Sequence, residues 1–262
     1  MGAHQRIDRI AKRHFNKVMP RRAFFPTVRD ILKFEGRDGP DGIKRKSPSK
    51  DEPWHFIDPQ NSEDVKLLDM IDDHTVNLER ALFKRDNVRA AFEAAWLAHA
   101  IVDGLTPAHH YPFESKLEEL RGGLQLDTRN TIRSKLVLPG ETRRHQLRNN
   151  WAFWGAKGVM TTHGLFELGF ATTISSLRLD ETCPTPNELI RVKQEGIRML
   201  FLENLHQIHD LKMYETFQKK GWNRSLVRQA RAELAPRIIR VVVLSWYGAS
   251  LRAEKRRKGE KA

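Results

Sequence analysis

Apolar residues recur every three or four positions along most of this chain, which is the period of a helix buried on one side. In the first such segment, Ile7, Ile10, Ala11 and Phe15 fall on one face. The predicted helices cover residues 4–19, 27–34, 63–85, 88–106, 115–121, 128–136, 158–177, 187–211 and 225–253. No pair of alternating segments indicates strands, and no internal repeat is present. We therefore predict an all-α, single-domain multi-helix bundle over residues 1–262.

Three stretches do not share this period. Residues 35–53 are rich in Gly, Pro and charge, which is typical of a loop. Residues 110–158 are the least regular part, and within them the run ETRRHQLRNNW is basic without apolar spacing. The chain ends in a basic tail from about residue 252 to 262. We expect these stretches to lie outside the helical core.

The net charge of the chain indicates which kinds of molecule it would bind. Lys and Arg outnumber Asp and Glu by 46 to 33, which gives a formal net charge of +13. Such an excess favours anionic partners, namely nucleic acid, a phospholipid surface or a phosphate ester. The basic tail suits any of these, although an ordinary solvated tail has the same composition. A hydrophobic content of 39% excludes a disordered chain.

Other classes are disfavoured by what the sequence lacks. Cys183 is the single cysteine, so an internal disulfide framework and a thiolate metal site are both excluded. The start, MGAHQRIDRIAK, has no apolar core of a signal peptide, and the apolar run around Arg240 is too short to span a membrane. As written, the chain would be cytoplasmic with at most peripheral membrane contact. Its oligomeric state is left open.

The segment 99–109, HAIVDGLTPAH, carries the most specific polar residues. His99 and Asp103 are four apart on an apolar helix, so both side chains leave from one face. Pro107 ends that helix, and His109 follows the turn. A buried imidazole and carboxylate need partners, because burying a polar group without a hydrogen-bond partner costs on the order of several kcal/mol. A divalent metal suits both, although the two could equally bond each other or the backbone.

A second pair with the same spacing favours the metal. His163 and Glu167 are again four apart in an apolar helix, whereas alone they would indicate a surface pair. Further ligand types occur at His55, between Trp54 and Phe56, and at Asp41 in a Gly-Pro loop. Together these residues are enough for two or more zinc ions with positions left for water.

The order of these residues resembles the superfamily of bacterial zinc-dependent phospholipases C and single-strand-specific zinc nucleases. The resemblance rests on His4, Asp41, His55, then H-x3-D-x5-H at 99–109 and H-x3-E at 163–167. It covers most of the chain, up to the LSWYG of the final helix. It implies a helical bundle with two or three zinc ions at the bottom of a cleft.

Carried over by position, the resemblance implies three ligand sets. One zinc would use Asp41, His55, His99 and Asp103, and a second would use His109, His163 and Glu167. A third would use His4, the N-terminal amine and carbonyl, and Asp103 as a bridge to the first. Asp41 is also the implied general base, while Phe56 and Asp58 would bind the substrate by stacking and hydrogen bonding.

The two branches of the superfamily predict different substrates. Glu167, where the nucleases usually have Asp, and the spacing from Asp41 to His55 favour the phospholipases. The sequence departs from that branch at Glu52, where the choline pocket has an aromatic residue. It also begins Met-Gly-Ala-His, where the largely secreted family has an N-terminal Trp, and residues 111–157 include an insertion.

We therefore expect a zinc-dependent phosphodiester hydrolase, phospholipase C-like, in which a metal-bound hydroxide attacks the phospholipid. The alternative within the superfamily is a single-strand-specific nuclease acting on RNA or DNA. A further alternative is a non-catalytic basic protein that is stabilised by zinc and binds nucleic acid. Zinc sites that are purely structural use cysteines more often, which disfavours this last alternative.

Overall fold

The computed structural model describes residues 2–35, 39–40, 55–125, 128–129 and 131–259. Within these ranges every regular element is helical, so the predicted all-α fold is confirmed. The α-helices are α1 (Ala3–Val18), α2 (Val28–Lys33), α4 (Lys66–Lys84), α5 (Asn87–Leu105), α6 (Phe113–Leu120), α7 (Ile132–Leu136), α8 (Arg143–Trp154), α9 (Val159–Ile174), α10 (Pro186–His209), α11 (Met213–Lys220), α12 (Arg224–Gln229) and α13 (Ala235–Arg257).

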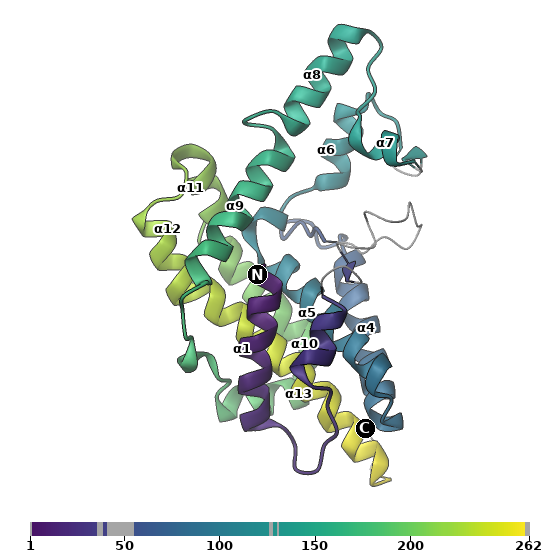
Figure 1. The fold of residues 1–262 in the computed structure, drawn as a ribbon, viewed down its shortest axis with the longest axis vertical. Helices are drawn as coiled ribbons and strands as arrows, with labels where there is room; N and C mark the ends of the chain where they lie inside the picture. Colours follow the sequence, from purple (N-terminus) through teal and green to yellow (C-terminus); the bar gives the residue numbers. More distant parts are fainter. Residues whose placement is uncertain (1, 36–38, 41–54, 126–127, 130, 260–262) are drawn as a thin grey trace.

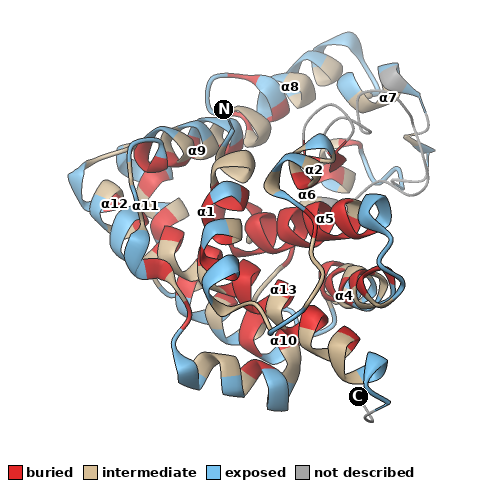
Figure 2. Cartoon of the chain, turned by 60° about the horizontal axis from the view of Figure 1, so that its bottom comes forward, coloured by how far each residue is buried: buried red, intermediate tan, exposed pale blue. Residues whose placement is uncertain are grey.

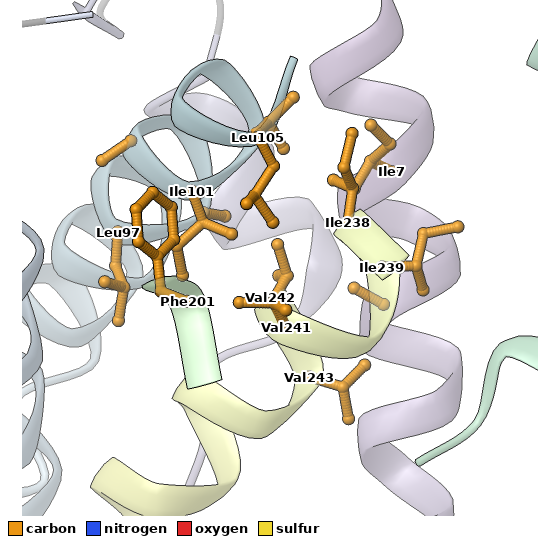
Figure 3. Close-up of a cluster of buried hydrophobic side chains, with 14 of the residues drawn as sticks. Ile7, Leu97, Ile101, Leu105, Phe201, Ile238, Ile239, Val241, Val242 and Val243 are labelled. Carbon is orange, nitrogen blue, oxygen red and sulfur yellow. The ribbon is translucent and has the colours of Figure 1, made fainter. Parts of the chain in front are cut away.

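Helices α5 and α13 form the centre of the bundle, and α1, α4 and α10 pack around them (Figure 1). Figure 3 shows the apolar contact where α1, α5, α10 and α13 meet. There Ile7 of α1 and Phe201 of α10 are fully buried beside Ile238 and Val242 of α13. Burying each such side chain contributes about 1.5–3 kcal/mol, so this contact fixes how the helices are placed.

Helix α5 is buried on nearly all sides, and Figure 2 shows it as an almost continuous buried segment. Its alanines allow α4 and α13 to approach closely, and Trp246 Nε1 of α13 donates to the carbonyl of Ala94 at 3.0 Å. Asp86 caps its first turn by accepting the Arg89 N–H. After Thr106, a short 3-10 turn at Pro107–His109 reverses the chain. The carboxyl end of α5 and this turn are thereby held rigidly in the core.

Helices α6, α7 and α8 extend away from the bundle (Figure 1). They have a small apolar cluster of their own, formed by Leu117, Leu138 and Phe153, which is separate from the main core. We call this part of the structure the α6–α8 lobe. It is joined to the bundle by the turn after α5 and by α9.

The structure differs from the predicted elements in three places. The basic run is helix α8, and residues 213–220 form α11, although neither was predicted. The last helix runs to Arg257, four residues beyond the predicted end. Its final turns are held by Arg252, which pairs with Glu79 at 3.0 Å, and by Arg256 over the ring of Phe83. The predicted tail therefore begins as part of α13.

Among the described residues, one helical stretch, Arg224–Arg257, has the length and composition needed to cross a membrane. It comprises α12, a π-helical turn and α13. However, 72% of its most apolar window is buried inside the fold. Because its apolar surface is already covered by α1, α4, α5 and α10, the stretch has the character of a core helix.

Candidate metal centre

The carboxylate of Asp103, at the carboxyl end of α5, lies at the centre of four histidine rings. Its Oδ1 is 3.1 Å from His4 Nε2 and 3.6 Å from His109 Nε2. Its Oδ2 is 3.1 Å from His99 Nε2 and also contacts His55 Nδ1. These side chains come from α1, α5, the turn after α5 and the segment before α4, which the core packing holds together.

Two groups of side chains lie close enough together to bind one metal ion each. The first group is His4, His99 and Asp103. The second group is His109, His163 and Glu167, with Glu167 Oε1 2.9 Å from His109 Nε2 and 3.1 Å from His163 Nε2. Because His109 is close to Asp103 as well as to Glu167, the two groups adjoin.

The tautomers of these histidines suit a metal. His109 Nδ1 is 2.8 Å from the carbonyl oxygen of His55, and His163 Nδ1 is 3.2 Å from that of Ala108. A carbonyl only accepts, so both Nδ1 atoms donate, and the Nε2 atom of each ring faces Glu167, where it can carry a proton or bind a metal ion. His99 follows the same pattern, with Nδ1 3.0 Å from Glu35 and Nε2 directed at Asp103. This arrangement, with Nδ1 bonded to an outer acceptor, is typical of metal-binding histidines.

Sequence reasoning missed two buried carboxylates beside the first group. Glu35 Oε1 contacts His99 and lies 3.7 Å from His4 Nδ1, and the two stacked rings have centroids 4.1 Å apart. Asp8 is 1% exposed, and burial together with Glu35 raises its pKa well above 3.8. Asp8 lies four residues after His4, the same spacing as in the other two His–carboxylate pairs, so this spacing could have identified it from the sequence. Glu35 had no local signal, because its partners are distant in the sequence.

Without a cation, protons stabilise this cluster. Burial would lower the pKa of His4, His99 and His163, but the neighbouring carboxylates outweigh burial and raise it. Burial would raise the pKa of Asp103 and Glu167, but the neighbouring histidines outweigh it and lower both. A metal ion would take the place of these protons, since metal ligands must be deprotonated.

A cavity of about 100 Å³ opens beside the second group. It is lined by aromatic, apolar and cationic side chains, among them Phe56, Tyr111, Lys157, Met160, His163 and Tyr214. Burial, together with Tyr111 and Glu167, raises the pKa of Tyr214 to about 12, so its hydroxyl keeps its proton at neutral pH. The cavity can therefore take an apolar or planar group next to an anionic one.

Seven of the eight predicted ligands are brought together in this way: His4, His55, His99, Asp103, His109, His163 and Glu167. The eighth, Asp41, lies outside the described residues, and so does its predicted role as general base.

The two predicted substrate-binding residues differ in position. Phe56 lines the cavity, stacks on Phe113 with centroids 4.2 Å apart, and lies 5.1 Å from the ring of His109. Asp58 is part of a turn, where its Oδ1 accepts the Gln60 N–H at 3.0 Å. Its own N–H donates to Asp64. Phe56 therefore lies at the cavity and Asp58 caps a turn, and the role of each in substrate binding stays a prediction.

The donor set fits zinc. It consists of imidazole nitrogens and carboxylate oxygens, and two buried carboxylate oxygens beside it, Glu35 Oε2 and Asp8 Oδ2, have no hydrogen-bond partner among the described residues. Such atoms are costly to bury unless something binds them. No protein-family model, curated protein or solved structure matches this chain.

Proposed function

We propose that this chain is a zinc-dependent phosphodiester hydrolase with a phospholipase C-like activity. The observation that carries the proposal is the pair of adjoining His–carboxylate groups joined through Asp103 and His109. Zinc ions bound there would supply an activated water at neutral pH and neutralise the charge of the phosphodiester. Neighbouring metal ions of this kind are typical of enzymes that hydrolyse phosphate esters.

The chain's own residues would orient the ions and the substrate. Glu35, the His55 carbonyl and the Ala108 carbonyl hold the outer nitrogens of His99, His109 and His163. This fixes the direction of each ligand lone pair. The protonated hydroxyl of Tyr214 can donate to a phosphate oxygen, and Lys157 can pair with a second anionic group in the cavity.

The substrate class follows from the cavity and the ligand set. Glu167 and the apolar side chains around Phe56 and Met160 favour a phospholipid. The alternative is a single-strand-specific nuclease, favoured by the ring of Phe56, on which a base could stack. A non-catalytic zinc protein that binds nucleic acid is the remaining alternative, and it predicts binding without turnover.

The test is a paired assay on the full chain loaded with zinc. One arm contains vesicles of phosphatidylcholine with or without phosphatidylglycerol, and the other contains single-stranded DNA and RNA. Each arm is run with EDTA, with His99→Ala and with His209→Ala as a matched control outside the cluster. We expect diacylglycerol release that is abolished by EDTA and by His99→Ala but kept by His209→Ala.

Each other outcome is informative. Nucleotide release with the same sensitivities would move the protein to the nuclease alternative. Bound zinc without turnover in either arm would overturn the proposal of a hydrolase for these substrates. Turnover that persists in EDTA would show that the chemistry does not depend on this metal centre.

A further inference from the structure

Helix α8 exposes large apolar side chains to solvent. The side of α8 that packs on the rest of the lobe carries a single buried aromatic residue, Phe153, beside polar ones: Asn150 accepts the N–H of Leu138 and donates to its carbonyl, and Asn149 donates to the carbonyl of Pro139. Elsewhere on the helix, Leu147 is 73% exposed and Trp151 is 70% exposed. A helix whose apolar residues point to solvent leaves a surface that a partner is expected to cover.

The apolar surface continues beyond α8. Trp154, at the end of the helix, is 43% exposed, and its Nε1 donates to the carbonyl of Leu136 at 2.8 Å. This contact places Leu136 and Val137 next to it, both of which are also exposed. We call the surface formed by Leu136, Val137, Leu147, Trp151 and Trp154 the α8 face. It lies on the lobe that projects from the bundle (Figure 1).

Arginines flank the α8 face. Arg143, Arg144 and Arg148 are exposed on α8, and the helix itself contains no Asp or Glu. Within the described part of the chain, no carboxylate pairs with these arginines. Arg191 on α10, by contrast, pairs with Glu195 and Glu203 at 2.9 and 2.7 Å. Unpaired cations around an apolar surface are complementary to an anionic partner that also has an apolar interior.

We propose that the α8 face docks onto an anionic phospholipid membrane. Tryptophan and leucine beside arginines are the composition of helices that lie in the membrane interface. Anionic headgroups would pair with the arginines, while Trp151 and Leu147 enter the boundary of the acyl chains. A single-stranded nucleic acid would also pair with arginine and stack on tryptophan. It would gain little from Leu136, Val137 and Leu147, so the membrane is favoured.

The position of the α8 face connects docking to the metal centre. The α8–α9 turn follows the face directly, and Thr161 Oγ1 donates to the carbonyl of Trp154 at 2.8 Å. Lys157 in this turn and Met160 in the first turn of α9 line the cavity beside His163. A membrane bound at α8 would therefore lie close to the cavity. Docking goes beyond the proposed function, because binding to a membrane does not require turnover.

The test measures binding of the full chain to vesicles in EDTA, so that hydrolysis plays no part. One set of vesicles contains phosphatidylcholine with about 30 mol% phosphatidylglycerol, which gives an anionic surface. Vesicles of pure phosphatidylcholine, which have no net charge, serve for comparison. The test variant is Leu147→Glu with Trp151→Glu. The control is Ile190→Glu with Met199→Glu on α10, where both residues are also about half exposed. Both double variants change the net charge equally, so only the location differs.

We expect the wild type and the control to bind the anionic vesicles equally, and the test variant to bind at least about tenfold more weakly. All three proteins should unfold at the same urea concentration, because the replaced side chains are exposed. Lipids with brominated acyl chains should quench the tryptophan fluorescence of the wild type. The quenching should be lost in Trp151→Phe with Trp154→Phe.

Three results would overturn the proposal. The first is no binding of the wild type to anionic vesicles at any protein-to-lipid ratio. The second is a test variant that binds these vesicles as well as the control does. The third result is loss of binding to a single-stranded RNA oligonucleotide in the test variant while vesicle binding is unchanged. This last result would assign the α8 face to nucleic acid instead.

Discussion

At the scale of single residues, the site is organised by carboxylates that each serve more than one histidine. Asp103 faces His4 and His109 through one oxygen and His99 and His55 through the other. Glu167 faces the same nitrogen of His109 and one further ring nitrogen, that of His163. Buried charges of this kind are retained only where they are paired or bind a metal. Removing either of these carboxylates would therefore remove a contact from more than one histidine at once.

Replacing Asp103 with Asn should reduce zinc affinity at least about 100-fold, more than the loss of an outer-sphere partner. The amide keeps the shape of the side chain but loses its charge and offers a weaker oxygen ligand. Isothermal titration calorimetry and metal analysis after dialysis would measure the loss. Asp73→Asn, at an exposed position on α4, is the control and should bind zinc as the wild type does.

Replacing Glu35 with Gln should lower zinc affinity by about 10- to 100-fold, the range for residues that orient a ligand. The Gln oxygen can still accept the proton of His99 Nδ1, but without the charge that makes the ring a better ligand. Glu35→Ala should have the larger effect of the two. Equal zinc affinity in Glu35→Gln, Glu35→Ala and the exposed control Glu63→Gln would contradict this role.

At the scale of elements, the centre depends on how closely α5 approaches its neighbours. At Gly104, next to Asp103, an added Cβ would lie 2.5 Å from Leu67 Cδ2 of α4 and 2.7 Å from Phe201 Cζ of α10. Both neighbours are themselves buried in the core. A side chain at position 104 would have to push these helices apart and would move Asp103 with them.

We therefore expect Gly104→Ala to lower the free energy of unfolding by about 1–3 kcal/mol, the usual cost of overpacking. It should also weaken zinc binding, because Asp103 shifts. Gly164→Ala on α9 is the matched control, since nothing lies within 4 Å of a Cβ there. It should stabilise the protein by up to about 1 kcal/mol through helix propensity. Urea unfolding of both variants measures the two effects, and equal stability would contradict the packing argument.

At the scale of the whole molecule, the centre couples stability to pH and to zinc. In the metal-free chain, His4, His99 and His163 have raised pKa values, so protons bound to them stabilise the fold. That stability is complete below about pH 6.5, the ordinary histidine pKa, and is lost as the pH rises through the folded values. Each unit by which folding raises a histidine pKa adds up to about 1.4 kcal/mol to the free energy of unfolding.

We expect the metal-free protein in EDTA to become less stable between about pH 7 and 8.5, a window chosen to lie above the ordinary histidine pKa. With micromolar zinc the trend should reverse, because deprotonated ligands bind zinc more tightly and binding stabilises the folded state. Urea unfolding midpoints at several pH values would measure both slopes. His110 does not interfere, since burial lowers its pKa to about 3 and it stays neutral here. Slopes of the same sign with and without zinc would contradict the coupling.

The sequence by itself determined the pairs of residues that share a helix face and most of the helices. Residues four apart on a helix share a face, so His99 with Asp103 and His163 with Glu167 could be paired without any structure. The apolar period likewise predicted the main helices and the all-α class. It failed at α8, because the buried side of that helix has asparagines beside a single buried aromatic residue, Phe153, while Leu147 and Trp151 point to solvent, so no regular apolar period marks the helix.

Only the tertiary structure decided which distant residues meet. Glu35 is 64 positions from His99, so no spacing rule could place them in contact. His109 is 58 positions from Glu167, and before the structure only the resemblance, not the spacing, had grouped them. Their proximity results from the packing of α1, α5 and α9 around one core, which depends on side-chain shape in three dimensions. The same packing decided that the two ligand groups adjoin and that the α8 face projects beside the cavity.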